Sequence, residues 1–186
     1  MVASRQSPLP EGEDEGEGPP EDSMRVLGID PGSLITGFGV VEDAAGVLCA
    51  LAWGTVRTSS SQPLPVRLKH IYDGLSEALH TWQPEAVAVE RVFFAENPKT
   101  ALILGHARGV ALLTAANAAL PLVEYSALEI KQAVVGYGRA GKAQMQQMVR
   151  ALLRLDTLPQ PADAADALAA AICHVHTSGF QSKVLR

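Results

Sequence analysis

The chain has 186 residues, 47% of them hydrophobic, which is enough for one domain that buries its core without covalent cross-links. Its two cysteines, Cys49 and Cys173, exclude a disulfide framework and indicate the reducing cytoplasm. The most apolar window, residues 101–123, contains His106 and Arg108, which excludes a membrane span and predicts a buried helix. The first residues are polar and acidic, so we expect no secretory leader.

The formal net charge of −5 is concentrated at the N-terminus. Residues 1–23 hold seven acids and one base, a net of −6, which leaves +1 for residues 24–186 with 14 bases and 13 acids. Such a Pro-, Gly- and Glu-rich stretch predicts a disordered tail. The tail either keeps the protein in solution or imitates nucleic acid in a basic groove. We predict one folded domain over residues 24–178 and a flexible C-terminus over 179–186.

Three closely spaced apolar runs open the domain and predict an antiparallel meander of strands at 24–30, 36–43 and 47–58. Strand and helix patterns then alternate. Helices are predicted at 64–82, 98–118, 127–134, 142–154 and 162–177, and further strands at 86–93 and 121–125. Asn97 and Pro98 form a typical N-cap and first residue for the longest of these helices. The order predicts an α/β fold, a five-stranded mixed sheet with helices on both faces.

Four acids stand in apolar surroundings. Asp30 follows "VLGI", Glu90 follows "VAV", and Asp163 and Asp166 lie in the Ala-rich helix start "PADAADALAAAICH". Each has an ordinary explanation. Asp30 suits a turn before Pro31-Gly32, Glu90 an exposed strand end, Asp163 a helix N-cap and Asp166 a first-turn acid.

Taken together, the four acids indicate one site, because an isolated buried carboxylate is costly unless it is paired or binds a metal. Carboxylate ligands suit hard cations, and two Mg²⁺ or Mn²⁺ ions can clamp the oxygens of a phosphoryl displacement. No zinc-type cluster competes, since His174 and His176 would face opposite sides of a helix. A glycine-rich, basic loop with Arg139 and Lys142 is placed to lie over a bound polyanion.

Four sequence blocks in order resemble the RuvC family of bacterial Holliday junction resolvases. They are "GIDPGSLITGFGVVE", "VAVERVFFAENPKTALILGHARGVAL", "EYSALEIKQAVVGYGRAGKAQMQQMVR" and "ADAADALAAAICH", and the resemblance runs from Met24 to about His176. It implies an RNase H-like fold and a homodimer that resolves four-way DNA junctions in recombination and repair. Paired symmetric nicks would leave 5′-phosphate and 3′-hydroxyl ends.

The same resemblance assigns roles to single residues. Asp30, Glu90, Asp163 and Asp166 would hold two divalent cations, Mg²⁺ or Mn²⁺. Phe93 would stack on unpaired bases, and Lys131 and Lys142 would contact phosphates. The resemblance also implies RuvA and RuvB, the branch-migration proteins, as partners. Three features depart from the family pattern: the acidic tail, Glu96 in place of a base, and Gly141 before Lys142.

Other interpretations of the sequence stay open. A non-catalytic junction-binding module or an RNase H-like nuclease acting on RNA would share the fold. "DPGSLITGFG" also fits loosely the phosphate loop of actin-, Hsp70- or sugar-kinase-like domains, but 163 residues are too few for both of their domains. Gly105 and Gly109, with Ala101 and Ala116, offer a close-approach face on the long helix. That face would cross the same helix of a second subunit or pack on the sheet.

Overall fold

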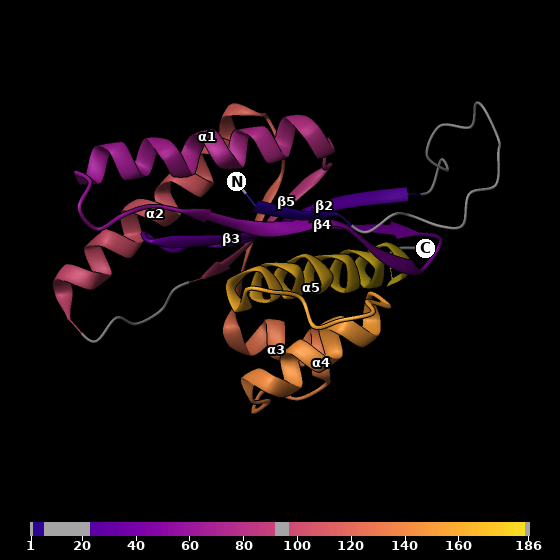
Figure 1. Cartoon of the computed structure of the whole chain (residues 1–186). Helices are drawn as coiled ribbons and strands as arrows, with labels where there is room; N and C mark the ends of the chain where they lie inside the picture. Colours follow the sequence, from indigo (N-terminus) through magenta and orange to yellow (C-terminus); the bar gives the residue numbers. More distant parts are fainter. Residues whose placement is uncertain (1, 6–22, 92–96, 185–186) are drawn as a thin grey trace.

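The computed structural model describes residues 2–5, 23–91 and 97–184 (Figure 1). The strands are β1 (Val2–Arg5), β2 (Ser23–Asp30), β3 (Ile35–Ala44), β4 (Val47–Arg57), β5 (Ala86–Arg91) and β6 (Leu122–Ser126). They form one sheet in the order β1-β4-β3-β2-β5-β6. The first four strands of this order pair antiparallel, whereas β2, β5 and β6 are parallel. The predicted mixed sheet and its meander are confirmed.

Helices cover both faces of the sheet, as predicted. They are α1 (Leu64–Trp82), α2 (Pro98–Asn117), α3 (Ala127–Val135), α4 (Lys142–Leu152) and α5 (Ala162–Val184). Figure 1 shows α1 and α2 on one face and α3, α4 and α5 on the other. Each face has its own core, one around Phe38, Ile71 and Leu75 and one around Leu168 and Ile172.

Both ends of the chain carry more regular structure than predicted. Val2–Arg5, within the predicted disordered tail, forms β1 and pairs with Ala52–Thr55 of β4. The free edge of β4 explains this departure, because it offers unpaired backbone groups to any extended segment. Residues 6–22 lie outside the described part. At the other end α5 continues to Val184, into the predicted flexible C-terminus.

The long helix α2 begins as predicted, because the Asn97 side chain accepts a hydrogen bond from the Thr100 amide at 2.8 Å and Pro98 follows. Its buried face consists of Ala107, Ala111, Thr114 and Ala115. Gly105 and Gly109 are exposed, and a Cβ added at either would meet no atom within 4 Å. The alternative that this glycine face packs on the sheet is therefore wrong.

Helix α5 lies unusually close to the sheet, because the strands under it carry glycine where other residues would carry a side chain. A Cβ at Gly28 would overlap the carbonyl oxygen of Ala167, and a Cβ at Gly37 would overlap that of Asp163. At Gly39 a Cβ would lie 2.7 Å from the Leu168 side chain. Residues 167–175 of α5 are all buried, between the sheet on one side and α3 and α4 on the other. The Ala-rich sequence of α5 follows from this position.

Gly28→Ala should therefore destabilise the protein, since the new methyl group meets main chain that cannot rotate away. We expect a loss of about 1–3 kcal/mol in the free energy of unfolding, measured by urea denaturation. Gly74→Ala on α1 is the matched comparison. The three atoms nearest to its Cβ would all belong to the Val56 side chain, the first at 2.6 Å, and helix propensity favours alanine there. Equal losses for the two variants would contradict the close-packing explanation.

Candidate active site

Asp30 is the last residue of β2, and Glu90 is the second-last residue of the neighbouring parallel strand β5, so both lie at the same edge of the sheet. The β2–β5 register pairs Ile29 with Val89, so each acid is one residue beyond this pair. Both side chains are half-buried. No hydrogen bond joins the Asp30 carboxylate to the backbone of the following turn within the described residues, so the turn explanation for Asp30 lacks its defining contact.

Helix α5 brings the other two acids to this edge. It begins at Ala162, so Asp163 lies inside the first turn rather than at the N-cap. Asp166 is three residues further along, on the same side of the helix. The contact between Gly37 and the Asp163 backbone fixes the start of α5 over the strand that pairs with Asp30.

The carboxylates repel one another in a partly dehydrated place. Burial, and after it the negative charges of Glu90 and Asp166, together raise the pKa of Asp30 to about 7. The negative charge of Asp163 also raises the pKa of Asp30, whereas the positive charge of Lys142 lowers it. Burial also raises the pKa of Glu90, with Asp166 as the next cause. Perturbed carboxylates of this kind mark functional sites.

Two lysines that the family resemblance assigned to phosphate contacts lie beside the acids. Lys142 Nζ lies 3.1 Å from Asp166 Oδ2, and this contact raises the pKa of the lysine. The positive charge of Lys131 on α3 lowers the pKa of Glu90. Both lysines line a cavity of about 240 Å³ together with Glu90 and Asp166. Its remaining lining is apolar and comes from Ala127, Ile130, Met145 and Ala169.

The donor set suits a hard divalent cation, because it offers carboxylate oxygens and no thiolate or imidazole. Within the described residues, no three acid, His or Cys side chains stand close enough to surround one ion in this structure. The mutual effects on pKa nonetheless place the four acids within electrostatic reach of one another. The residues therefore fit a cation that would draw them together.

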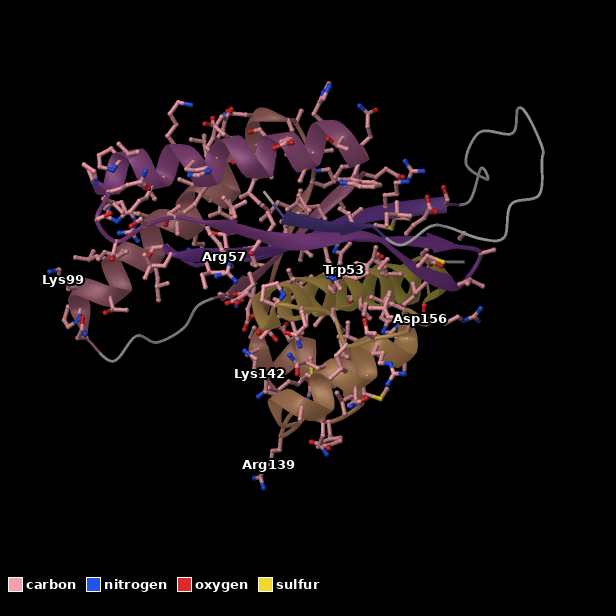
Figure 2. The ribbon with its side chains drawn as sticks, in the orientation of Figure 1. Trp53, Arg57, Lys99, Arg139, Lys142 and Asp156 are labelled. Carbon is pink, nitrogen blue, oxygen red and sulfur yellow. The ribbon has the colours of Figure 1, made fainter. Side chains whose placement is uncertain are left out.

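Two other predicted site residues have different outcomes. Arg139 is exposed, and Figure 2 shows it at the outer tip of the α3–α4 connection, pointing away from the sheet. The structure does not bring it to the acids. Phe93 lies outside the described residues, as does Glu96. The predicted difference between the two histidines is confirmed, since His174 is buried and bonded to the Tyr125 hydroxyl at 2.9 Å while His176 is exposed.

Sequence reasoning missed one residue beside the site, Arg67 on α1. It is only 8% exposed, and its guanidinium donates to the carbonyl oxygen of Ser33 at 2.7 Å, three residues after Asp30. A signal was present in the sequence. Arg67 precedes Ile71 and Leu75 at a spacing of four, so it belongs to the apolar stripe of its helix.

Comparison with known proteins identifies the class of this fold. The yeast mitochondrial Holliday junction resolvase Ydc2 is 17% identical over 84% of this chain and 79% of its own, with a TM-score of 0.60, and so shares the fold. The fold is RNase H-like.

Closer relatives define the family. The family model described as "Crossover junction endodeoxyribonuclease RuvC" matches residues 26–174. The protein of that name from Syntrophotalea carbinolica is 57% identical over 153 residues, 82% of this chain and 94% of the relative. That from Desulforamulus reducens is 50% identical over 155 residues, 83% and 95% of the two chains. The chain belongs to the RuvC family of crossover junction endodeoxyribonucleases.

A solved structure agrees with this assignment. Thermus thermophilus RuvC, described in complex with Holliday junction substrate, is 38% identical, with a TM-score of 0.81 over 85% of this chain and 96% of its own. The family is one of DNA endonucleases, which favours the predicted activity over a binding module or an RNA-acting nuclease. Among the described residues no helix is long and apolar enough to cross a membrane.

The carboxylate cluster predicts an unusual stability profile for the metal-free protein. A raised pKa means that the Asp30 carboxyl stays protonated in the folded chain from about pH 4 to about pH 7 while it is ionised in the unfolded chain. Its contribution to the free energy of unfolding is therefore present below pH 4 and lost as the pH rises to 7. Asp30→Asn should be more stable than the wild type by a margin that grows over this range, up to about 4 kcal/mol.

The measurement is urea denaturation in chelator between pH 4 and pH 8. Asp156→Asn is the control, because Asp156 is exposed and lies beyond the far end of α4 from Lys142 (Figure 2). A margin for Asp30→Asn that stays constant across the range would contradict the assigned cause.

Proposed function

We propose that the chain resolves Holliday junctions by metal-assisted hydrolysis, with Asp30, Glu90, Asp163 and Asp166 as the catalytic and metal-binding residues. The observation that carries this proposal is the gathering of four carboxylates at one edge of the sheet, where burial and mutual repulsion raise the pKa of Asp30 to about 7. A protein keeps such a costly arrangement when a cation compensates it. The complex of the Thermus relative with a Holliday junction supports the substrate.

The geometry suggests a division of roles among the acids. Asp30 is the last residue of β2 and lies within electrostatic reach of the other three acids, so it would help to hold both cations, Mg²⁺ or Mn²⁺. Glu90, from the adjacent strand, would hold one of them. Asp163 and Asp166 would close the site from α5 and orient the attacking water. Bound cations would lower the pKa of that water and would stabilise the negative charge on the departing 3′-oxygen.

Lys131 and Lys142 would hold the scissile phosphate at the cavity. Their ammonium groups stand beside Glu90 and Asp166, so positive charge is already present where DNA brings negative charge. Arg139 would contact a neighbouring phosphate further out, and Phe93 would stack on an unpaired base. The products would carry 5′-phosphate and 3′-hydroxyl ends. We expect the protein to work in the cytoplasm, with RuvA and RuvB as partners in branch migration.

Paired nicks require two active sites, and α2 offers the surface for a homodimer. Leu102 is 67% exposed and Leu113 is 54% exposed, and Gly105 and Gly109 lie between them on the same side of the helix. A close crossing with the same helix of a second subunit would bury this stripe and create an isologous interface. The two sites would then act on two strands of like polarity.

Removing single carboxylates tests the catalytic assignment. Asp30→Asn and Asp166→Asn should each lower the nicking rate on a synthetic four-way junction by at least about 1,000-fold in Mg²⁺, because a ligand of the bound cation is lost. Junction binding in a gel-shift assay should remain. The control is Asp156→Asn, an exposed acid away from the site. Wild-type nicking by Asp30→Asn in Mg²⁺ would refute the assignment.

A bulky charge in the stripe tests the dimer. Gly109→Arg should weaken self-association at least about tenfold in sedimentation experiments, since two guanidinium groups would meet at the crossing. In this variant the rate of paired nicking should fall by a larger factor than the affinity for a single junction arm. Glu77→Arg, at an exposed position of α1, is the control for adding an arginine. A dimer of Gly109→Arg as tight as the wild type would exclude this face.

A further inference from the structure

Arg67 on α1 and Thr58, the residue after β4, hydrogen-bond to the turn that follows Asp30. Arg67 donates to the Ser33 carbonyl oxygen through Nη2 at 2.7 Å and Nε at 3.3 Å. The Thr58 hydroxyl donates to the same oxygen at 2.7 Å, and the Thr58 amide donates to the Leu34 carbonyl at 2.9 Å. The Arg67 Nε also reaches the Thr58 hydroxyl at 3.4 Å. The main chain next to the central acid is thus fixed by four contacts.

Arg67 has an unusual environment for a charged side chain. It is 8% exposed, and within the described residues no carboxylate lies within 4.0 Å of its guanidinium. Burying an unpaired charge is unfavourable, and an apolar side chain at this position would continue the buried stripe of α1. The arginine therefore has a use other than stabilising the core, and its contacts direct that use to the turn.

These contacts also fix where the amide groups of the turn point. The Thr36 hydroxyl donates to the Gly32 carbonyl oxygen at 2.6 Å, and Thr36 itself is buried. In a trans peptide the N–H points opposite to the C=O, so the N–H groups of Ser33 and Leu34 point away from these inward donors. No hydrogen bond within the described part of the chain uses either of these two amides.

The direction of the amides matters because α1 and α5 cover opposite faces of the sheet (Figure 1). The Ser33 carbonyl points toward Arg67 on α1, so the Leu34 amide points toward the face that carries α5 and its acids. The Leu34 side chain is 44% exposed, so the turn reaches the surface. Gly32 is required there, since a Cβ would overlap the carbonyl oxygen of Ile35.

We propose that the turn over residues 31–34 binds a phosphate of the DNA strand being cut, close to the scissile phosphate. The amides of Ser33 and Leu34 are the donors, because successive free N–H groups in a turn form an anion-binding concavity. Arg67 is the positioning residue that holds the turn in this orientation, and its charge favours an anion nearby. The inference rests on the proposed function, since it assigns the phosphate to the substrate of the same site.

The experiment combines a protein variant with an altered DNA. Uncharged methylphosphonate linkages are placed one at a time over the three phosphates on either side of the nick, and single-turnover nicking in Mg²⁺ is measured. At one position the neutral linkage should slow the wild type about 10- to 100-fold, as expected for loss of hydrogen bonds to a charged group. Arg67→Met should nick unmodified DNA more slowly than the wild type does. The neutral linkage at that position should then slow this variant by less than about a further threefold.

Two further variants complete the comparison. Thr58→Val removes one donor to the Ser33 carbonyl oxygen while keeping the side-chain shape. Its nicking rate should likewise respond little to the neutral linkage at that position. This variant decides the question if Arg67→Met does not fold. Lys69→Met removes a positive charge two residues along α1, where the side chain is 75% exposed, and should respond to the DNA changes as the wild type does.

The outcomes separate this inference from the proposed function. If both variants are slowed by the same factor as the wild type at every linkage, Arg67 has a structural role only and the inference is wrong. If Asp30→Asn, tested on the same unmodified junction, nicks at the wild-type rate, the proposed function itself fails. An inactive Asp30→Asn together with uniform linkage effects therefore rejects the phosphate site alone.

Discussion

The direct contact between α5 and the glycine-lined strands determines where half of the acids lie. Gly28, Gly37 and Gly39 let the helix backbone approach the sheet to a distance at which a Cβ would collide. A helix standing one side-chain layer further away would carry Asp163 and Asp166 away from the strand ends. The active site thus depends on a packing distance. The need for that distance explains both the glycines of β2 and β3 and the small, apolar residues of α5.

The same contact forces like charges together, and the rest of the site limits the consequence. Burial and neighbouring acids raise the pKa values of Asp30 and Glu90, so these acids oppose the folded state at neutral pH when no cation is bound. Lys142 offsets part of this by its ion pair with Asp166. Since the lysine is largely exposed, it could leave that acid if the proposed cation and phosphate bound there. The acids at this edge lower the free energy of unfolding, and the two apolar cores compensate for that loss.

The parts of the fold that depend on local pattern could be predicted, and those that depend on distant pairing could not. The strands and helices of the domain followed from periodicity, and the four acids stood out because their neighbours are apolar. The pairing of Val2–Arg5 with β4 depends on a free strand edge 50 residues away, which composition does not reveal. Arg67 was missed for a related reason. An arginine on an amphipathic helix is ordinary, and only the fold shows that it faces inward to Ser33.

The two faces of the sheet therefore serve the site in different ways. The face with α5 supplies acids, and the face with α1 supplies a rigid support for the turn that follows Asp30. Asp30 itself belongs to β2, which pairs with β3 on one side and β5 on the other, so its main chain has little freedom. The proposed role of Asp30 as a cation ligand would benefit from such a support, because a mobile strand end would relax away from the other acids. The tight turn after Asp30 is in this respect part of the active site: it anchors the central acid to both layers of the protein.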